Sequence, residues 1–355
     1  MFEPQILSPA LQPAAPTAAD ALAILYDGED LNRAQAETLF GSLVRGELSE
    51  PDIAAMLVAL RLKRETSEEL VGAARALRAA DLDFPRPDYL FADSCGTGGD
   101  GLGSINVSTA VAFVAAAAGL PVVKHGNRSF SSRCGSADVL EQLGARLDLA
   151  PQTSRDILDE TGICFLFAPL YHPGLKHAGP VRRALRVRTI MNLLGPCLNP
   201  AEPPVQLLGV ADPALLEPVA ATLKSLGVET ALVVHGSGLD EIALHGETQA
   251  VRLHYGRLDP MILTPEDAGL TRAPIDTARG GGPEENAERL RRLLAGRARR
   301  SEADLIALNA GALLMTASLA ETLKDGVALA AETIASGAGL RVMQRYVEAS
   351  NDGIR

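Results

Sequence analysis

Hydrophobic positions from residue 18 to about residue 82 recur at the three-to-four-residue spacing of amphipathic helices. Three polar residues stand where helix N-caps are expected, each just before an apolar stripe: Asn32, Ser49 and Thr66. The segment Phe84-Pro-Arg-Pro87 then interrupts the helical spacing. The pattern predicts a small helical domain over residues 18–85, which we expect helices from about residues 172–190 to join.

From about residue 90 the pattern changes to short apolar runs that alternate with longer helical runs. Five runs are strand candidates: residues 90–93, 121–124, 164–168, 205–210 and 230–235. Four helical runs accompany them: residues 108–118, 136–143, 214–226 and 283–294. This alternation predicts an α/β domain over residues 86–355, with a mostly parallel central sheet flanked by helices. Ligands of such sheets bind at the carboxyl ends of the strands.

The N-terminus and the cysteines indicate the cellular compartment in which the protein is expected. The first sixteen residues carry four prolines and no positively charged cluster, so we expect residues 1–17 to be a disordered tail and not a secretory signal. The longest apolar stretch, residues 110–123, is too short and too interrupted to span a bilayer. The four cysteines form neither a CxxC pair nor a zinc-ligand spacing. We therefore expect a cytoplasmic protein with no membrane partner.

Charge narrows the function classes further. Among 355 residues, 44 Asp and Glu face 33 Lys and Arg, which gives a net charge of −11. This balance argues against a nucleic-acid partner, which would need a basic surface. Aromatic residues make up only 4%, with no Trp, so stacking platforms for bases are scarce. Any anion bound by this chain must be held by local geometry against the overall charge.

A glycine-rich segment follows the first strand candidate. Residues 96–101 read Gly-Thr-Gly-Gly-Asp-Gly, and a helical run begins near Ser108. Glycines let the backbone approach a ligand closely, and a helix N-terminus attracts anions. The spacing fits neither GxGxxG nor GxxxxGK[ST], which excludes a Rossmann or P-loop assignment. We interpret the segment as a phosphate-binding loop, with a plain surface turn as the alternative.

A polar segment follows the second strand candidate. Residues 124–136 contain three basic side chains together with five Ser and Asn residues. Charge-assisted donors and hydroxyl groups at this density predict a second anion-binding loop. Ser136 is expected to cap the next helix, and Asp138 to lie in its first turn.

Two later segments carry candidate chemistry. Pro180 suits the first turn of a helix on which Arg182 and Arg186 would share one face, with Arg183 on the flank. We expect two of these arginines at the surface, while one can clamp a carboxylate. The acid pair at residues 240–241 follows a Gly-rich turn, and we expect both carboxylates on the solvent side. Such a pair suits Mg²⁺ when phosphate completes the ligand set; a solvated loop is the alternative.

Taken in order, these segments resemble anthranilate phosphoribosyltransferases. The resemblance rests on residues 96–101, 106–109, 124–128, 135–141 and 192–196, and it is extended by residues 240–241 and 281–286. It covers nearly the whole chain from residue 20. Members of this glycosyltransferase family join the amino nitrogen of anthranilate to C1 of 5-phosphoribosyl 1-diphosphate (PRPP) in tryptophan biosynthesis. The resemblance implies a homodimer and Mg²⁺, with two ions per subunit.

The resemblance also implies roles for individual residues. The PRPP site would comprise Gly96, Gly99, Asp100, Ser104, Asn106, Val107, Ser108, Thr109, Lys124, His125, Gly126, Asn127, Arg128, Ser129, Phe130, Ser131, Ser132 and Ser136. The anthranilate pocket would comprise Gly96, Asn127, Arg182, Gly195 and Pro196. The metal ligands would be Ser108, Asp240 and Glu241. No obligatory acid or base is assigned, and His125 is a candidate only for orienting substrate.

Three positions depart from the family pattern. Cys134 stands where Ser is usual, Ile105 where an aromatic residue is frequent, and Val107 where Ile is common. All three changes are conservative. The competing functions are a nucleoside phosphorylase-like enzyme, which would not need the acid pair, and a non-catalytic binding relative. A nucleic-acid-binding relative should be basic, which the net charge of −11 disfavours.

Overall fold

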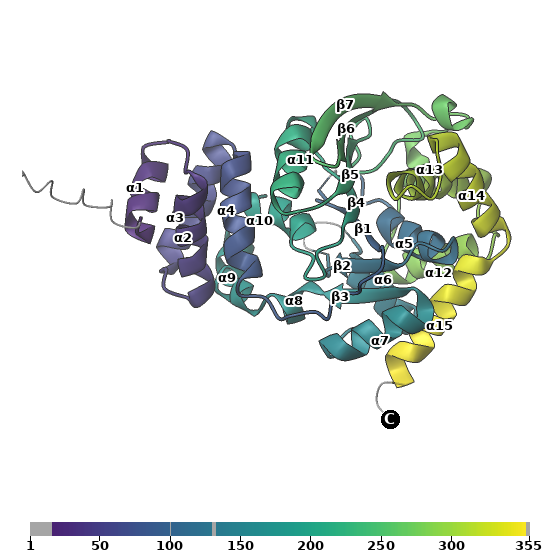
Figure 1. Cartoon of the computed structure of the whole chain (residues 1–355), viewed down its shortest axis with the longest axis horizontal. Helices are drawn as coiled ribbons and strands as arrows, with labels where there is room; N and C mark the ends of the chain where they lie inside the picture. The colour runs from purple at the N-terminus through teal and green to yellow at the C-terminus, as the bar shows by residue number, and fades with distance from the viewer. Residues whose placement is uncertain (1–15, 100, 130–132, 353–355) are drawn as a thin grey trace, which may run out of the picture.

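The structure is a computed structural model that describes residues 16–99, 101–129 and 133–352 (Figure 1). Four helices at one end of the molecule form a helical unit: α1 (Ala18–Tyr26), α2 (Arg33–Arg45), α3 (Glu50–Lys63) and α4 (Ser67–Arg78). The expected tail lies outside the described residues up to residue 15. Its last residue, Thr17, caps α1 by accepting the backbone N–H of Asp20, so Thr17 belongs to the helical unit and not to the tail.

The predicted caps begin the next three helices. Asn32 and Thr66 each form a capping box with the residue three positions on, and Ser49 accepts the backbone N–H of Asp52. Each side-chain oxygen satisfies an N–H that the first helical turn leaves without a partner. The three predicted helix starts are confirmed.

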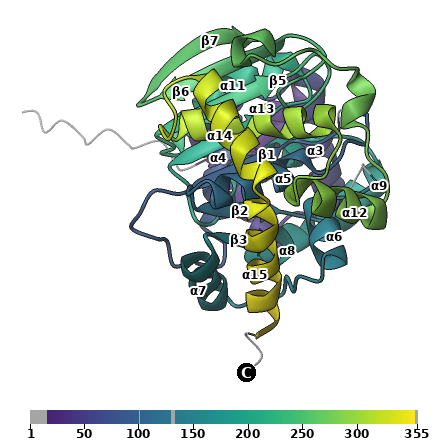
Figure 2. The same ribbon diagram turned by 90° about the vertical axis from the view of Figure 1, so that its right-hand side faces the viewer.

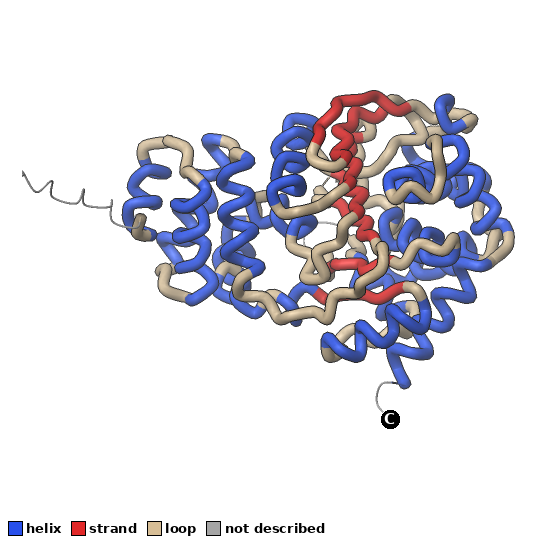
Figure 3. The backbone as a smooth tube through the Cα atoms, viewed as in Figure 1, coloured by secondary structure: helices blue, strands red, loops and turns tan. Residues whose placement is uncertain are grey.

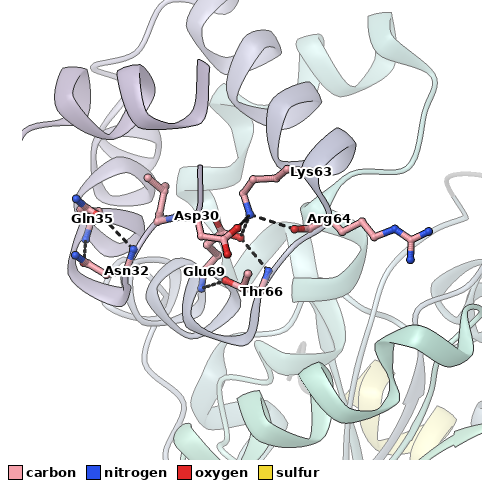
Figure 4. A network of polar contacts seen from close by, with 8 residues as sticks. Asp30, Asn32, Gln35, Lys63, Arg64, Thr66 and Glu69 are labelled. Carbon is pink, nitrogen blue, oxygen red and sulfur yellow. Dashed lines mark hydrogen bonds and ion pairs between the residues drawn. The ribbon is translucent and has the colours of Figure 1, made fainter. Parts of the chain in front are cut away.

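Glu69 is fully buried and joins two turns of the helical unit (Figure 4). Its carboxylate accepts the backbone N–H groups of Leu31 and Thr66, both at 2.9 Å, and the ammonium group of Lys63 at 2.7 Å. Lys63 also donates to Asp30 Oδ1 at 2.7 Å. Because a buried charge is stable only when it is paired and hydrogen-bonded, this network fixes the α3–α4 turn against the loop before α2.

A later segment packs against these helices. It contains α8 (Ala168–Tyr171), α9 (Gly179–Leu185) and α10 (Ile190–Leu194). Val181, Ile190 and Leu194 share a buried core with Leu39 of α2 and Leu70 of α4. Residues far apart in the sequence thus form one helical body beside the sheet.

Seven strands form one central sheet in the order β3-β2-β1-β4-β5-β6-β7. They are β1 (Ala92–Gly96), β2 (Val122–Gly126), β3 (Ile163–Phe167), β4 (Val205–Gly209), β5 (Thr230–His235), β6 (Thr248–His254) and β7 (Arg257–Leu263). The first five strands are parallel to one another, and β6 and β7 are antiparallel additions. The predicted α/β class with a mostly parallel sheet is confirmed, and all five predicted strands are present with small shifts at their ends.

The β6–β7 hairpin was not predicted. It lies at the edge of the sheet, where β6 alternates between buried and exposed residues and β7 is largely exposed. Pro260 lies within β7, and proline inside a strand is confined to edges because it cannot donate to the ladder. An exposed edge hairpin with a proline therefore lacks the continuous apolar run that marks the inner strands.

Helices cover both faces of the sheet (Figures 2 and 3). They are α5 (Val107–Ala117), α6 (Ser136–Gln142), α7 (Pro151–Thr161), α11 (Leu216–Ser225), α12 (Pro283–Leu294), α13 (Arg300–Thr316), α14 (Leu323–Ala335) and α15 (Ala338–Asp352). On β4, Leu207 joins the core shared with α5 and α13, while Leu208 joins the core shared with α11. Successive strand residues thus serve opposite faces. Among the described helices, none has the length and apolar character to cross a membrane.

Candidate functional site

A cavity of about 300 Å³ opens at the carboxyl ends of β1, β2 and β5. The loops after these strands form one wall, and the segment from α8 to Leu198 forms the opposite wall. The cavity therefore lies where a parallel sheet is expected to bind its ligand, between the sheet and the helical unit.

The described residues of the predicted site all line this one cavity. From the predicted PRPP site these are Gly96, Gly99, Ser104, Asn106, Val107, Ser108, Thr109, Lys124, His125, Gly126, Asn127, Arg128, Ser129 and Ser136. From the other predicted sets these are Arg182, Gly195, Pro196, Asp240 and Glu241. Four predicted residues lie outside the described residues: Asp100, Phe130, Ser131 and Ser132.

The glycine loop and the acid pair are packed against each other. Asp240 Oδ2 accepts the backbone N–H of Gly98 at 2.6 Å, and Asp240 is only 6% exposed. A Cβ atom at Gly96 would lie 2.4 Å from this carboxylate, so only glycine permits the close approach. The expectation that both acids lie on the solvent side is wrong for Asp240, because its carboxylate is engaged by the backbone of the loop.

Lys124 lies beneath the glycine loop and is buried. Its ammonium group donates to the carbonyl of Ser94 at 2.5 Å and to Ser108 Oγ at 3.1 Å. Lys124 thereby joins the middle of β2 to β1 and to the first turn of α5. A buried cation and a helix N-terminus on the same wall favour a bound anion.

Asp93 is the buried carboxyl group behind this wall. Burial raises its pKa to about 6, and the charge of Lys124 together with a 2.9 Å hydrogen bond from Asn199 opposes the rise. The protonation of Asp93 is therefore the result of competing desolvation and pairing.

The second loop is closed by Asp138. Its carboxylate accepts the backbone N–H groups of Ser129 at 2.9 Å and of Gly135 at 2.8 Å. Gly135 is thus the N-cap of α6, and Ser136 is the first helical residue. The prediction that Ser136 caps the helix is wrong; its hydroxyl instead donates to the carbonyl of Asn127 at 3.3 Å. The prediction that Asp138 lies in the first turn is confirmed.

Arg128 is held at the rim of the cavity. Its guanidinium group pairs with Glu141 of α6 and lies 5.4 Å from the ring centroid of Phe167. Arg128 is half-exposed, so its charge is directed both to Glu141 and to the mouth of the cavity.

The three arginines in and directly after α9 differ in position. Arg182 lines the cavity, and burial lowers the pKa of its guanidinium group. Arg183 and Arg186 are exposed. The prediction that Arg182 and Arg186 share one helical face is wrong. The helix α9 ends at Leu185, and Arg186 has a left-handed φ of 52°.

Some residues of the site were not predicted. These lining residues are Cys95, Ile105, Cys134, Gly135, Ala168, His172, Leu175, Met191, Asn192 and Leu198. Arg188 was missed as well. It is not one of the lining residues, but its guanidinium group donates to the carbonyl of Gly99 at 3.2 Å. His172 and Arg188 belong to the arginine-rich segment, but no local spacing marks them as neighbours of the sheet loops.

The oxygen donors of the cavity fit a hard divalent cation. Ser108, Asp240 and Glu241 all line the cavity. Within the described ranges, no three His, Cys, Asp or Glu residues are grouped as a metal-binding cluster. Mg²⁺ typically binds one or two carboxylates and completes its shell with water and substrate phosphate. The residues present therefore suit Mg²⁺ that is bound together with a phosphorylated substrate.

Comparison with known protein families agrees with both parts of the fold. Residues 19–80 match the family model described as "Glycosyl transferase family, helical bundle domain". Residues 88–340 match the model described as "Glycosyl transferase family, a/b domain".

Three individual relatives of this chain are anthranilate phosphoribosyltransferases. An anthranilate phosphoribosyltransferase from Sorangium cellulosum is 57% identical to this chain, with 93% of this chain and 94% of the relative covered. The crystal structure of an anthranilate phosphoribosyltransferase from Thermus thermophilus has a TM-score of 0.89 at 45% identity and covers 94% of this chain and 99% of its own. The Saccharomyces cerevisiae enzyme in complex with PRPP and Mg has a TM-score of 0.86 at 25% identity, with coverage of 94% and 98%.

Proposed function

This chain belongs to the anthranilate phosphoribosyltransferase family, and on that premise we propose that it transfers the 5-phosphoribosyl group of PRPP to the amino group of anthranilate. The products are N-(5-phosphoribosyl)anthranilate and diphosphate, and the reaction belongs to tryptophan biosynthesis. The observation that carries the proposal is one cavity lined by a glycine loop, a buried lysine, an acid pair and a half-buried arginine.

The diphosphate and the ribose bind, in this proposal, on the sheet side of the cavity. Backbone N–H groups of the glycine loop and the ammonium group of Lys124 face the charged oxygens, and the segments 104–109 and 124–136 enclose the sugar. Positive charge from Lys124 and from the N-terminus of α5 offsets the unfavourable net charge of the chain.

Anthranilate binds on the opposite wall. Arg182 is placed to pair with its carboxylate, since a guanidinium group matches a carboxylate with two parallel hydrogen bonds. Gly96, Asn127 and the Gly195–Pro196 segment line the space around the ring. The amino group then faces C1 of the ribose across the cavity.

Ser108 and Glu241 would hold one Mg²⁺, and Asp240 with Glu241 would hold a second. Binding of Mg is supported by the yeast relative, whose structure is named as a complex with PRPP and Mg. Bound Mg²⁺ neutralises charge on the diphosphate oxygens. The Asp240 carboxylate already has a hydrogen bond from Gly98, so the same acid orients the glycine loop and contributes to the metal site.

The chemistry requires little acid–base assistance. The bond between C1 and the diphosphate oxygen breaks with its electron pair leaving on the diphosphate, and the amine lone pair forms the new bond to C1. The nitrogen then releases a proton. Lys124 and the loop N–H groups are preorganised around the leaving group, which stabilises the charge that develops there. Holding the neutral aromatic amine against C1 supplies much of the remaining acceleration.

The proposal includes the organisation of the protein. Residues 18–85, joined by the 172–190 segment, constitute the helical domain, and residues 86–355 constitute the PRPP-binding domain. The chain acts as a homodimer in the cytoplasm, with no nucleic-acid or membrane partner.

Loss of anthranilate fluorescence tests this activity directly. The purified protein should consume anthranilate only when PRPP and Mg²⁺ are both present, and equimolar diphosphate should appear. A nucleoside with inorganic phosphate serves as the control for a phosphorylase. Turnover of the nucleoside, or no consumption of anthranilate with PRPP and Mg²⁺, would show that the proposed function is wrong.

A further inference from the structure

Asn309 on α13 contacts the chain directly after the acid pair. Asn309 is fully buried, with 0% of its surface exposed. Its Oδ1 accepts the backbone N–H of Ile242 at 2.8 Å, and its Nδ2 donates to the carbonyl of the same residue at 3.0 Å. Ile242 follows Glu241 in the sequence and lies outside the helices and strands. One side chain therefore binds both backbone polar groups of the residue next to a candidate metal ligand.

The orientation of the Asn309 amide is determined by its partners. Its Nδ2 also donates to the carbonyl of Leu305, one turn earlier on α13, at 3.0 Å. Two carbonyl groups thus face the nitrogen and one N–H faces the oxygen. Exchange of the two amide atoms would place like groups against each other at all three contacts. The Asn309 side chain is therefore fixed, and it restricts the position of Ile242.

The helix that carries Asn309 is closely packed at this point. Gly311, two residues on, crosses Gly326 of α14. A Cβ atom at Gly311 would lie 2.4 Å from the backbone nitrogen of Val327, and a Cβ atom at Gly326 would lie 2.3 Å from the carbonyl oxygen of Gly311. Only glycine permits this approach of two helix backbones. The helix α13 is therefore held against α14 immediately beside Asn309.

The backbone of the acid pair is also held from the sheet. A Cβ atom at Gly209, the last residue of β4, would lie 1.6 Å from the carbonyl oxygen of Asp240, so the strand end and the acid pair are in backbone contact. After Ile242, the N–H of Ala243 donates to Thr248 Oγ1 at 2.9 Å. The segment that carries the two acids is thus supported by β4, by α13 and by Thr248.

We propose that Asn309 is a positioning residue for the metal site, which through the backbone of Ile242 fixes the direction in which Glu241 presents its carboxylate. Asn309 does not line the cavity, so it acts through the backbone and not on the substrate. Loss of a group that orients a metal ligand typically lowers metal affinity about ten- to a hundredfold. The inference rests on the proposed function, which places Mg²⁺ at the acid pair.

Asn309→Leu tests this role because leucine is similar in size but neither donates nor accepts a hydrogen bond. Mg²⁺ is titrated by calorimetry into the protein with PRPP and without anthranilate, so that no turnover occurs, and the heat of Mg²⁺ binding to PRPP alone is subtracted. The Kd for Mg²⁺ should rise on the order of tenfold.

Met343→Ala is the matched control for a general loss of stability. Met343 is buried on α15, which packs on α5 and α7. This variant should lower the melting temperature, because it leaves a cavity in the core, but it should not change the Kd for Mg²⁺.

Hydrogen exchange of single backbone amides, followed by NMR, gives a measurement without metal or substrate. In the metal-free wild type, the N–H of Ile242 should exchange slowly although it lies outside the helices and strands, because Asn309 accepts it. In Asn309→Leu its exchange should be faster on the order of tenfold. The N–H of Ala243, which is bonded to Thr248, should change little and serves as the internal reference.

Three results would overturn the proposal. The first is rapid exchange of the Ile242 N–H in the wild type, which decides the matter even if Asn309→Leu does not fold. The others are an unchanged Kd for Mg²⁺ in folded Asn309→Leu and an equal increase of this Kd in Met343→Ala. A wild-type protein that binds Mg²⁺ with PRPP but does not consume anthranilate would instead refute the proposed function and leave the role of Asn309 intact.

Discussion

Asn286 Nδ2 donates to Asn106 Oδ1 at 3.0 Å, across 180 residues of sequence. Asn286 is buried on α12, and its own Oδ1 accepts the backbone N–H of Gly281 at 2.8 Å. Asn106 in turn donates to the carbonyl of Cys134 at 3.2 Å. One chain of amides thus joins the C-terminal half of the protein to the start of α5 and to the second anion-binding loop.

Removing the side-chain amide of Asn286 should weaken PRPP binding, although Asn286 itself does not line the cavity. Asn286→Ala leaves Asn106 Oδ1 without its donor, and such a loss typically costs about 1–3 kcal/mol. We expect a raised KM for PRPP and a lowered melting temperature. Glu284→Ala, exposed on the same helix, is the control. Equal PRPP affinity in the two variants, measured by calorimetry, would show that Asn106 does not depend on Asn286.

The acid pair should determine the requirement for Mg²⁺. Asp240→Asn retains an oxygen that can accept the Gly98 N–H, and Glu241→Gln retains the side-chain size, but each removes a charge. Both variants should lose most activity at low Mg²⁺ and recover part of it as the concentration rises. Titration of turnover with Mg²⁺ provides the measurement, and circular dichroism checks the fold. Near wild-type turnover with an unchanged Mg²⁺ dependence would contradict the metal assignment.

Lys124 and Arg182 should affect the binding of different substrates. Arg182→Ala should weaken anthranilate binding on the order of ten- to a hundredfold, because a charge-assisted contact contributes about 1.5–3 kcal/mol. PRPP binding, measured by calorimetry in the absence of the amine, should be nearly unchanged. Lys124→Ala should show the reverse pattern. Since Arg183 is exposed beside Arg182, Arg183→Ala should be mild, and a strong effect there would mean that the wrong arginine has been assigned.

Asp93 should produce a pH-dependent contribution to stability. Its pKa of about 6 in the folded protein lies above the ordinary value of 3.8, so between these values the folded state binds the proton more tightly. The contribution of Asp93 to the free energy of unfolding should therefore fall as the pH rises from about 4 to about 6, and stay constant above that range. Urea unfolding of wild type and Asp93→Asn across this range measures the difference. A pH-independent difference would rule out the raised pKa.

Local signals made much of this fold predictable. The caps at Asn32, Ser49 and Thr66 and the apolar inner strands are marked by residues close in sequence, and they were identified correctly. The edge hairpin was missed because Pro260 and its exposed neighbours resemble a loop. Ser136 was misread because Asp138, two residues on, takes the capping contacts.

The residues of the cavity were only partly predictable from the sequence. Sequence motifs brought together the loops after β1, β2 and β5, because parallel strands end at the same edge. They could not identify the contact between His125 and His172, or that between Asn106 and Asn286, since each depends on tertiary packing of segments distant in sequence. The burial of Asp240 was also missed, because it depends on the close approach of Gly96, which is distant in sequence.

Arg188 connects the helical unit to the glycine loop of the cavity. Its guanidinium group contacts the carbonyl of Gly99, and its own carbonyl accepts from Arg61 on α3. A substitution on the outer surface of α3 that shifts this helix would therefore alter the glycine loop without changing any residue that meets substrate. Laboratory evolution for altered PRPP affinity can thus act on positions of α3 around Arg61, where the catalytic groups themselves remain intact.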